Sequence, residues 1–149
     1  MLESIVMTAM LTWGSETIDT SRFGEMDADI NQQTIMFNYD NFIVGVQELS
    51  INPEYLPKMS EEDVFIGYNY NGLVGVASDG MWGVLGTYPL PKDFYVSGSY
   101  IDREKVDRAT IGIGYKFTDT ISMQVNYGLT DYVNGAEGYF TAATLVINY

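Results

Sequence analysis

The sequence contains no cysteine and no histidine among its 149 residues. Without cysteine, the chain can form no disulfide, thiolate metal site or thiol nucleophile, and its cysteine content says nothing about the redox compartment. Without histidine, it lacks the usual general base of Ser-His and Cys-His catalysis and a common metal ligand. We therefore expect neither enzyme activity nor a cofactor.

Basic residues are also scarce: 7 Lys and Arg stand against 20 Asp and Glu, which gives a formal net charge of −13. A nucleic-acid partner would need clustered basic residues to neutralise phosphates, and here the basic residues are scattered. We expect no nucleic-acid partner, and we expect any solute attracted by charge to be a cation.

Long apolar runs are missing as well. No stretch of about 18 consecutive apolar residues occurs, so the sequence predicts no transmembrane helix. Residues 1–13 lack the basic region of a signal peptide, and Glu3 falls inside that segment, which suggests a cytosolic chain or one given in mature or truncated form. A membrane β-barrel remains open because its signal is alternation. The length and the 46% hydrophobic content fit one domain over residues 1–149.

The dominant pattern that is present is strict alternation. Over 120–129 the odd positions are apolar, from Ile121 to Leu129, and the even positions are polar or small. The same period-2 pattern covers 110–117, and the short Thr118-Asp119 between them predicts a hairpin. Gly112 and Gly114 follow this period, so we interpret them as crowded strand positions rather than a nucleotide loop. Similar segments upstream predict about ten strands, within a range of roughly 8–12, and no helix.

The links between these segments alternate in length. The longer links carry most of the charge and cover 15–29, 51–62, 102–107 and 130–137. The shorter links are 39–41, 71–72, 89–93 and 118–119, and only the tight Asp79-Gly80 breaks the alternation. Long loops at one end and tight turns at the other are typical of transmembrane barrels. The prediction is an all-β, antiparallel up-and-down (meander) barrel with both termini at the tight-turn end.

The two faces of the expected strands differ in chemistry. The polar faces carry mainly Thr, Ser, Asn, Gln and Gly, which suits a barrel interior. Residues expected to face this lumen are Lys116, Ser122, Gln124, Asn126 and Thr144. The apolar faces then meet lipid, where a charge at the midplane costs about 2–4 kcal/mol. Aromatic residues near the strand ends predict two interfacial belts, with Tyr39, Tyr70, Tyr88, Phe117 and Tyr149 at the tight-turn end and Trp13, Trp82 and Tyr127 at the loop end.

Two acidic segments are candidate sites. Residues 27–31 (DADIN) begin like an EF-hand loop, but Gln32 replaces the required glycine and Asn38 replaces the final glutamate, so an EF-hand is excluded. Weak Ca²⁺ or Mg²⁺ binding around Glu25, Asp27 and Asp29 is kept as a hypothesis. The run Glu61, Glu62 and Asp63 could act as an acid and base pair, but we interpret it as a solvated strand edge.

The C-terminal third carries the most specific pattern. It consists of GYKFTDTISMQVNYGLTD, Gly114 to Asp131, followed by a strand over 138–149 in which Leu145 and Ile147 alternate up to a final Tyr149. This hairpin and closing strand resemble those of bacterial outer-membrane β-barrels, which include the small OmpA/OmpX-type barrels and the general porins. The two central segments, 73–78 and 81–88, depart from the family because they are shorter than the roughly 9–11 residues of a spanning strand.

The resemblance implies a bacterial outer-membrane location with lipid as a partner. It implies either a passive, narrow pore for ions and small hydrophilic solutes, or a structural or surface barrel. The acidic links should make such a pore prefer cations. One alternative is a soluble antiparallel barrel or sandwich that binds a small ligand or forms an assembly, with Ile111, Ile113, Ile121, Met123 and Val125 facing inward. Another is a part of a larger porin barrel, closed by another chain or by missing sequence, whose open edges would drive formation of a homo-oligomer.

Overall fold

The computed structural model describes residues 5–20 and 24–149. Residues 1–4, which include Glu3 of the signal-peptide prediction, and 21–23, part of the expected link 15–29, lie outside the described residues. The chain forms ten strands: β1 (Val6–Thr20), β2 (Gly24–Tyr39), β3 (Phe42–Pro53), β4 (Met59–Tyr70), β5 (Leu73–Ser78), β6 (Met81–Pro89), β7 (Phe94–Arg103), β8 (Val106–Lys116), β9 (Ile121–Tyr132) and β10 (Glu137–Asn148).

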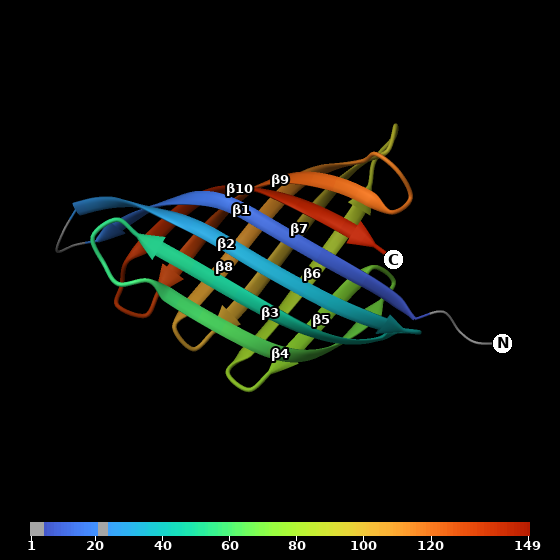
Figure 1. Ribbon diagram of the computed structural model, residues 1–149, viewed down its shortest axis with the longest axis horizontal. Coiled ribbons are helices and arrows are strands. Elements are labelled where there is room, and N and C mark those ends of the chain that lie inside the picture. The colour runs from blue at the N-terminus through green and yellow to red at the C-terminus, as the bar shows by residue number, and fades with distance from the viewer. Residues whose placement is uncertain (1–4, 21–23) are drawn as a thin grey trace.

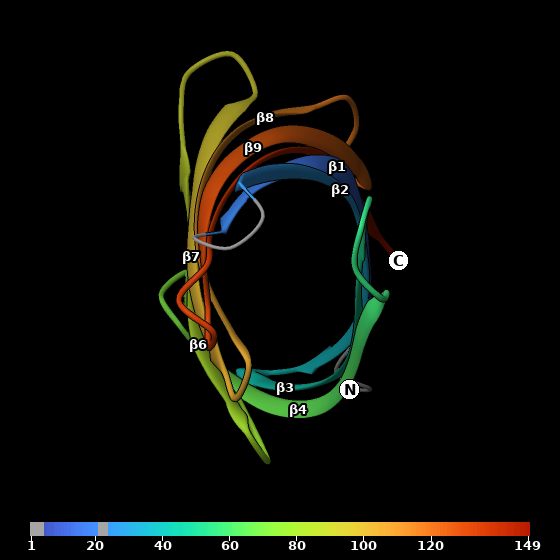
Figure 2. The ribbon, with the colours of Figure 1, turned by 90° about the vertical axis from the view of Figure 1, so that its left-hand side faces the viewer.

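Every strand pairs antiparallel with its sequence neighbours, and β1 pairs with β10, so the sheet closes into an up-and-down barrel (Figure 1). The closing pair runs in register from Thr8 opposite Asn148 to Asp19 opposite Glu137. Figure 2, a view turned by 90°, shows the oval outline of the barrel. The predicted all-β meander of about ten strands is confirmed, and the described chain closes the barrel by itself.

Along most of β8 and β9, the outer face of the barrel is apolar, as alternation predicted. Ile111 is 64% exposed and Val125 is 57% exposed, and Ile113, Ile121 and Met123 are exposed as well. The soluble alternative required these five side chains to face inward, and it is wrong on this point. In their place, the even-numbered residues of β8 and β9 face the interior.

The two ends of the barrel carry different links, although not the links that were expected. The turn end carries links 40–41, 71–72, 90–93 and 117–120 and the end of β10. The loop end carries the end of β1, the start of β2, and links 54–58, 79–80, 104–105 and 133–136. At the turn end, Asp40 and Asn71 adopt φ of 55° and 53°, which Asp and Asn tolerate in two-residue turns. The predicted contrast between long and short links is wrong, because strands occupy most of 15–29 and 51–62.

Strand structure continues into those segments because the alternation continues with its polarity reversed. Along β2, Met26, Ala28 and Ile30 are buried inside the barrel, whereas Asp27 and Asp29 between them are exposed outside. Charged outward positions had indicated a loop, but they belong to a strand whose outer face is polar. By contrast, β5 has only 6 residues and is as short as expected, whereas β6 has 9 and reaches the lower limit of a spanning strand.

Two groups of buried apolar side chains fill part of the interior. The larger, which we call the loop-end plug, joins β1–β3 to β8–β10 and comprises Ile18, Met26, Ala28, Ile30, Leu49, Ile51, Val106, Tyr132, Ala136, Phe140 and Ala142. The smaller lies on β3–β7 and comprises Ile43, Phe65, Val76, Met81 and Ile101. Among the described residues, no helix is long and apolar enough to cross a membrane.

Inward glycines make room for this packing. A Cβ atom on Gly128 would lie 2.1 Å from the Phe140 ring, and one on Gly114 would lie 2.1 Å from the Tyr95 ring. One on Gly112 would lie 2.3 Å from Oδ1 of Asn126. The interpretation of Gly112 and Gly114 as crowded positions inside a barrel is confirmed.

Candidate functional site

The lumen-facing residues named from the sequence include a connected polar chain in mid-barrel. Nε2 of Gln124 donates to Oδ1 of Asn126 at 2.8 Å, and Nδ2 of Asn126 donates to Oγ1 of Thr144 at 2.8 Å. The Thr144 hydroxyl also lies 2.7 Å from that of Thr12 on β1. Because each of these groups has a partner, this polar chain of side chains ties β9, β10 and β1 together across the inside of the wall.

Ser122 and Lys116 lie nearer the turn end. They are direct cross-strand partners of β8 and β9 and therefore share the inward face. Ser122 is buried and accepts a hydrogen bond from the Tyr95 hydroxyl at 3.2 Å, whereas Lys116 is exposed at the end of its strand. The structure thus places Lys116 at the turn-end mouth of the lumen, apart from the polar chain.

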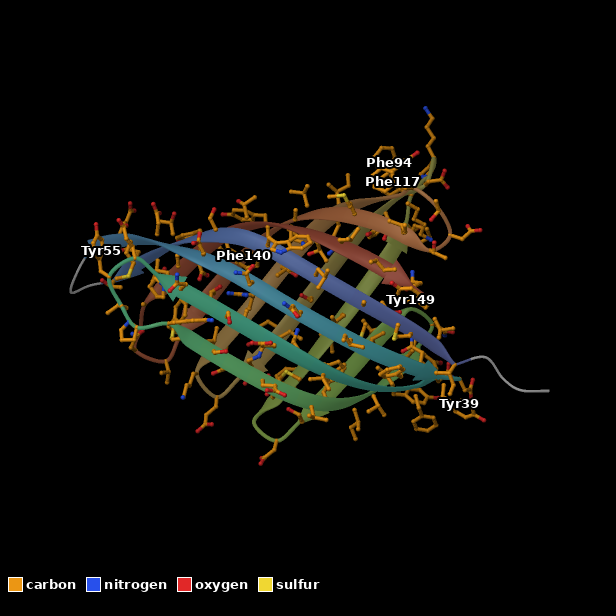
Figure 3. The ribbon with its side chains drawn as sticks, in the orientation of Figure 1. Tyr39, Tyr55, Phe94, Phe117, Phe140 and Tyr149 are labelled. Carbon is orange, nitrogen blue, oxygen red and sulfur yellow. The ribbon has the colours of Figure 1, made fainter. Side chains whose placement is uncertain are left out.

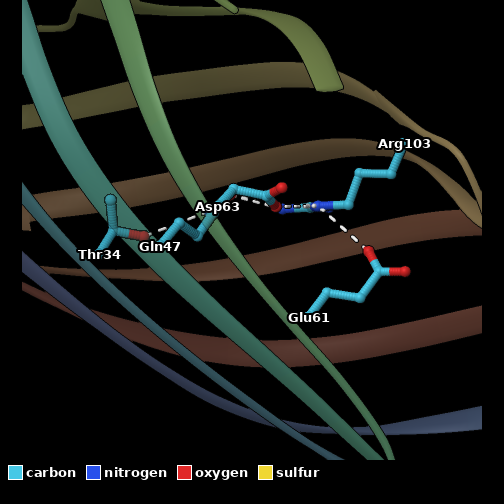
Figure 4. A network of polar contacts seen from close by, with 5 residues as sticks. All are labelled: Thr34, Gln47, Glu61, Asp63 and Arg103. Carbon is cyan, nitrogen blue, oxygen red and sulfur yellow. Dashed lines mark hydrogen bonds and ion pairs between the residues drawn. The ribbon is translucent and has the colours of Figure 1, made fainter. Parts of the chain in front are cut away.

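The lumen also contains charged residues that the sequence analysis missed. Arg103, at the loop end of β7, reaches across β5 and β6: its Nε lies 3.2 Å from Oδ2 of Asp63 and 3.8 Å from Oε2 of Glu61, both on β4 (Figure 4). Its Nη2 donates to the Gln47 side chain on β3, and Gln47 in turn donates to Thr34 at 3.3 Å. The interpretation of Glu61, Glu62 and Asp63 as a solvated edge is wrong for Glu61 and Asp63, which pair with this arginine, whose side chain is 2% exposed. Glu62 between them is exposed on the outer face.

A second buried ion pair lies against the loop-end plug. The Glu16 side chain on β1 is fully buried, and its Oε1 lies 3.8 Å from Nη2 of Arg108 on β8. The Tyr132 hydroxyl donates to Oε2 of Glu16, and Nε of Arg108 donates to the Thr130 hydroxyl at 3.2 Å. The Arg108 guanidinium also stacks 4.5 Å from the centre of the Phe140 ring. Four strands meet in this network.

Strand phase is the sequence signal that could have found these residues. Glu16 is two positions from Gly14 and four from Thr12, on the same inward face of β1. Arg108 likewise shares the phase of Thr110 and Gly112 on β8. A charge on the inward phase of a membrane barrel needs a partner of opposite sign inside, so its position predicts an interior ion pair.

A cavity of about 300 Å³ lies inside the barrel, between these networks and the turn end. Its lining includes Arg103, Arg108 and Phe140 toward the loop end and extends to Gly72 in the β4–β5 turn. Gln124, Asn126 and Thr144 also line it, whereas Lys116 and Ser122 do not. The polar chain, both arginines and the plug therefore border a single internal space.

The outer surface carries the predicted aromatic residues. All eight are exposed: Trp13, Tyr39, Tyr70, Trp82, Tyr88, Phe117, Tyr127 and Tyr149. Tyr39, Phe117 and Tyr149 lie together with Phe94 at the turn end (Figure 3). Trp82 packs against Tyr100 toward the loop end, with ring centres 5.6 Å apart. Trp13 and Tyr127, predicted at the loop end, lie near the middle of β1 and β9, so the turn-end group and the Trp82–Tyr100 pair are the parts of the two predicted belts that lie near strand ends.

An in-register row of carboxylates lies on the outer face, toward the loop end. We define the acidic row by six residues that are direct cross-strand neighbours on β2, β1, β10, β9, β8 and β7: Glu25, Asp19, Glu137, Asp131, Asp107 and Asp102. Among the described residues, none of the six makes an ion pair. Like charges directly opposite one another destabilise a sheet, so the row concentrates negative potential at this end.

The calcium hypothesis concerns the neighbouring part of β2. Glu25, Asp27 and Asp29 alternate along its outer face, and no group of three acidic residues within 5–20 and 24–149 is arranged to hold a metal ion.

The link 54–58 carries one perturbed phenol. A hydrogen bond with Glu54 raises the pKa of Tyr55 above its ordinary value.

No protein-family model and no curated protein matches the chain. Among solved structures, Neisserial surface protein A has a TM-score of 0.54 at 9% identity, with 96% of each chain covered. An outer membrane channel from Pseudomonas putida F1 has a TM-score of 0.49 at 9% identity, covering 100% of this chain and 97% of that one. The attachment invasion locus protein Ail of Yersinia pestis has a TM-score of 0.47 at 7% identity, covering 98% and 99%. At such low identity the likeness concerns the fold, and the chain has the fold of bacterial outer-membrane β-barrel proteins.

Proposed function

We propose that this chain spans the bacterial outer membrane and serves as a structural or surface barrel whose lumen is sealed at the loop end. The observation that carries the proposal is the loop-end plug, backed by the Arg103 and Arg108 networks. The plug draws its residues from six consecutive strands, β8–β10 and β1–β3, and Arg103 reaches over the two shortest strands, β5 and β6, to β4. A ten-stranded lumen is narrow in any case, since about eight strands are filled by side chains and about 16–18 leave a channel.

Insertion into lipid is supported by the exposed aliphatic band and by the aromatic groups at its two ends. The test uses the two tryptophans of the sequence, Trp13 and Trp82, which are 49% and 51% exposed on the outer face. In vesicles with brominated lipids, we expect stronger fluorescence quenching by bromine near the headgroup than by bromine deep in the acyl chains. The absence of quenching at every depth would contradict insertion.

Sealing is tested by conductance of the refolded full chain in planar bilayers. We expect no stepwise current from the unmodified protein, and we expect current from the variant Tyr132→Ala/Phe140→Ala, which truncates the two largest plug residues. The matched control is Tyr127→Ala/Tyr139→Ala, which removes two aromatic rings from the outer face and should stay silent. Stepwise currents from the unmodified protein would overturn the proposal of a sealed barrel.

The acidic row favours a second candidate, a narrow pore that prefers cations. Inside the lumen, three carboxylates, Glu16, Glu61 and Asp63, also outnumber the two arginines that they face. Negative potential at a mouth concentrates cations. If current does pass, this candidate requires a cation-selective reversal potential, and an anion-selective value would exclude it.

A further inference from the structure

Arg108 is a buried cation with few acceptors. Its side chain is 6% exposed, and its Nε is hydrogen-bonded to the Thr130 hydroxyl. Its Nη2 lies 3.8 Å from Oε1 of Glu16, beyond hydrogen-bond reach, and both of these atoms are buried without a hydrogen-bond partner among the described residues. Buried polar groups normally find a partner, so the environment of Arg108 calls for an additional acceptor oxygen.

The internal cavity lies directly beside this guanidinium and offers both polar and aliphatic contacts. Hydroxyl and amide groups come from Thr12, Thr110 and Asn126, on strands β1, β8 and β9. Strands β5–β7 supply the aliphatic side chains of Val74, Leu85 and Ile101, beside the hydroxyls of Thr87, Ser97 and Ser99. The volume, about 300 Å³, is at the lower end for ligand pockets. A cavity of this size accommodates a small organic molecule.

The charges around the cavity select the class of ligand. The charged residues in its lining are Arg103 and Arg108, which would repel a cation. Each arginine is backed by carboxylates, Glu16 on one side and Glu61 with Asp63 on the other, so the five charges sum to −1. An added anion would meet this negative sum, whereas an uncharged acceptor oxygen meets no repulsion from either sign.

We infer that this cavity is a binding site for a small uncharged amphiphile of the alcohol, amide or ester class. Its oxygen accepts a hydrogen bond from Arg108, and its aliphatic part packs against Val74, Leu85 and Ile101. The ligand enters from the turn end, where the cavity reaches Gly72, because the loop-end plug closes the opposite side.

The test uses the full chain in lipid nanodiscs, titrated with hexanamide, hexanoate and hexylammonium. Calorimetry, with empty nanodiscs subtracted, should give saturable binding of hexanamide and at least tenfold weaker binding of both charged analogues. In parallel, the side-chain Nε–H signal of Arg108 should shift and saturate with hexanamide. Absence of saturable binding would overturn the site, and hexanoate binding as tightly as hexanamide would overturn the uncharged class.

Two variants locate the ligand, and a third serves as a control. Val74→Phe fills the aliphatic part of the cavity and should abolish binding, whereas Val84→Phe adds the same ring on the outer face and should leave binding unchanged. Glu16→Gln/Arg108→Gln removes the ion pair without leaving a lone buried charge, and it should weaken hexanamide at least tenfold. Unchanged binding in both test variants would place the ligand outside the cavity. Bilayer conductance of the same preparations tests the sealed barrel separately.

Discussion

Neutralising one carboxylate in the middle of the acidic row should stabilise the barrel. Asp107 on β8 is directly opposite Asp102 on β7 and Asp131 on β9, so it has a like charge on each side. None of the three makes an ion pair among the described residues. Asp107→Asn keeps the shape of the side chain and removes both repulsions.

The size of the effect follows from the register. Directly opposed side chains have Cβ atoms about 5 Å apart, and a carboxylate separation of about 6 Å in water gives roughly 0.7 kcal/mol for each pair. Two neighbours give about 1.4 kcal/mol before screening. With Debye lengths of about 30 Å at 0.01 M and about 3 Å at 1 M, the gain falls from about 1.1 to about 0.2 kcal/mol.

The assay is urea unfolding in lipid vesicles at both salt concentrations, with the free energy of unfolding taken from the midpoint and slope. Asp119→Asn, in the turn-end link 117–120, is the matched control because it makes the same change far from the row. The reasoning is refuted if Asp107→Asn fails to stabilise the barrel at 0.01 M salt, or if its effect is the same at both salt concentrations.

The packing of the lumen leads to two more predictions. Glu16→Gln leaves Arg108 buried without its counter-charge and should lower the free energy of unfolding by about 3–5 kcal/mol. The double variant Glu16→Gln/Arg108→Gln should lose clearly less than the two single variants together. A double-mutant cycle of urea unfolding measures the difference, and simple additivity would show that the pair is uncoupled. Gly128→Val places a side chain where the Phe140 ring lies and should lower the free energy of unfolding by about 1–3 kcal/mol through overpacking. The control Gly75→Val has nothing within 4 Å of the added Cβ atom and should have little effect. Equal effects of the two variants on the unfolding midpoint would mean that the ring moves aside freely.

Period-2 alternation made the architecture predictable where lipid covers the outside. In β8 and β9 each side chain alternates between an apolar exterior and a small or polar interior, and both strands were located from the sequence within a few residues. Residue pairs such as Asn71-Gly72 predicted the positions of the hairpin turns, because these residues adopt positive φ readily. These signals are local, so a single sequence suffices to find them.

Contacts between distant strands were beyond local reasoning. Arg103 and Asp63 are separated by 40 positions, and Glu16 and Tyr132 by 116. Alternation predicts that such side chains point inward, but which of them are in contact depends on how the barrel closes. The expectation that the polar faces carry mainly uncharged residues missed Glu16, Arg103 and Arg108, because opposite charges can pair inside the lumen, where each compensates for the desolvation of the other.

For the membrane-spanning barrel that we propose, the reversal of polarity along β2–β4 gives the edge of the bilayer. Ile35, Val46 and Val64 form one in-register row on the outer face, and the next row toward the loop end is Gln33, Glu48 and Glu62. On the far wall the same change occurs between the row of Tyr100, Ala109, Leu129 and Tyr139 and the row of Asp102, Asp107, Asp131 and Glu137. Both boundaries follow from one rule: outward side chains match the surrounding solvent, while the interior stays packed. Beyond the boundary on β1–β3, the strands therefore bury apolar residues inside, and this reversal is what builds the loop-end plug.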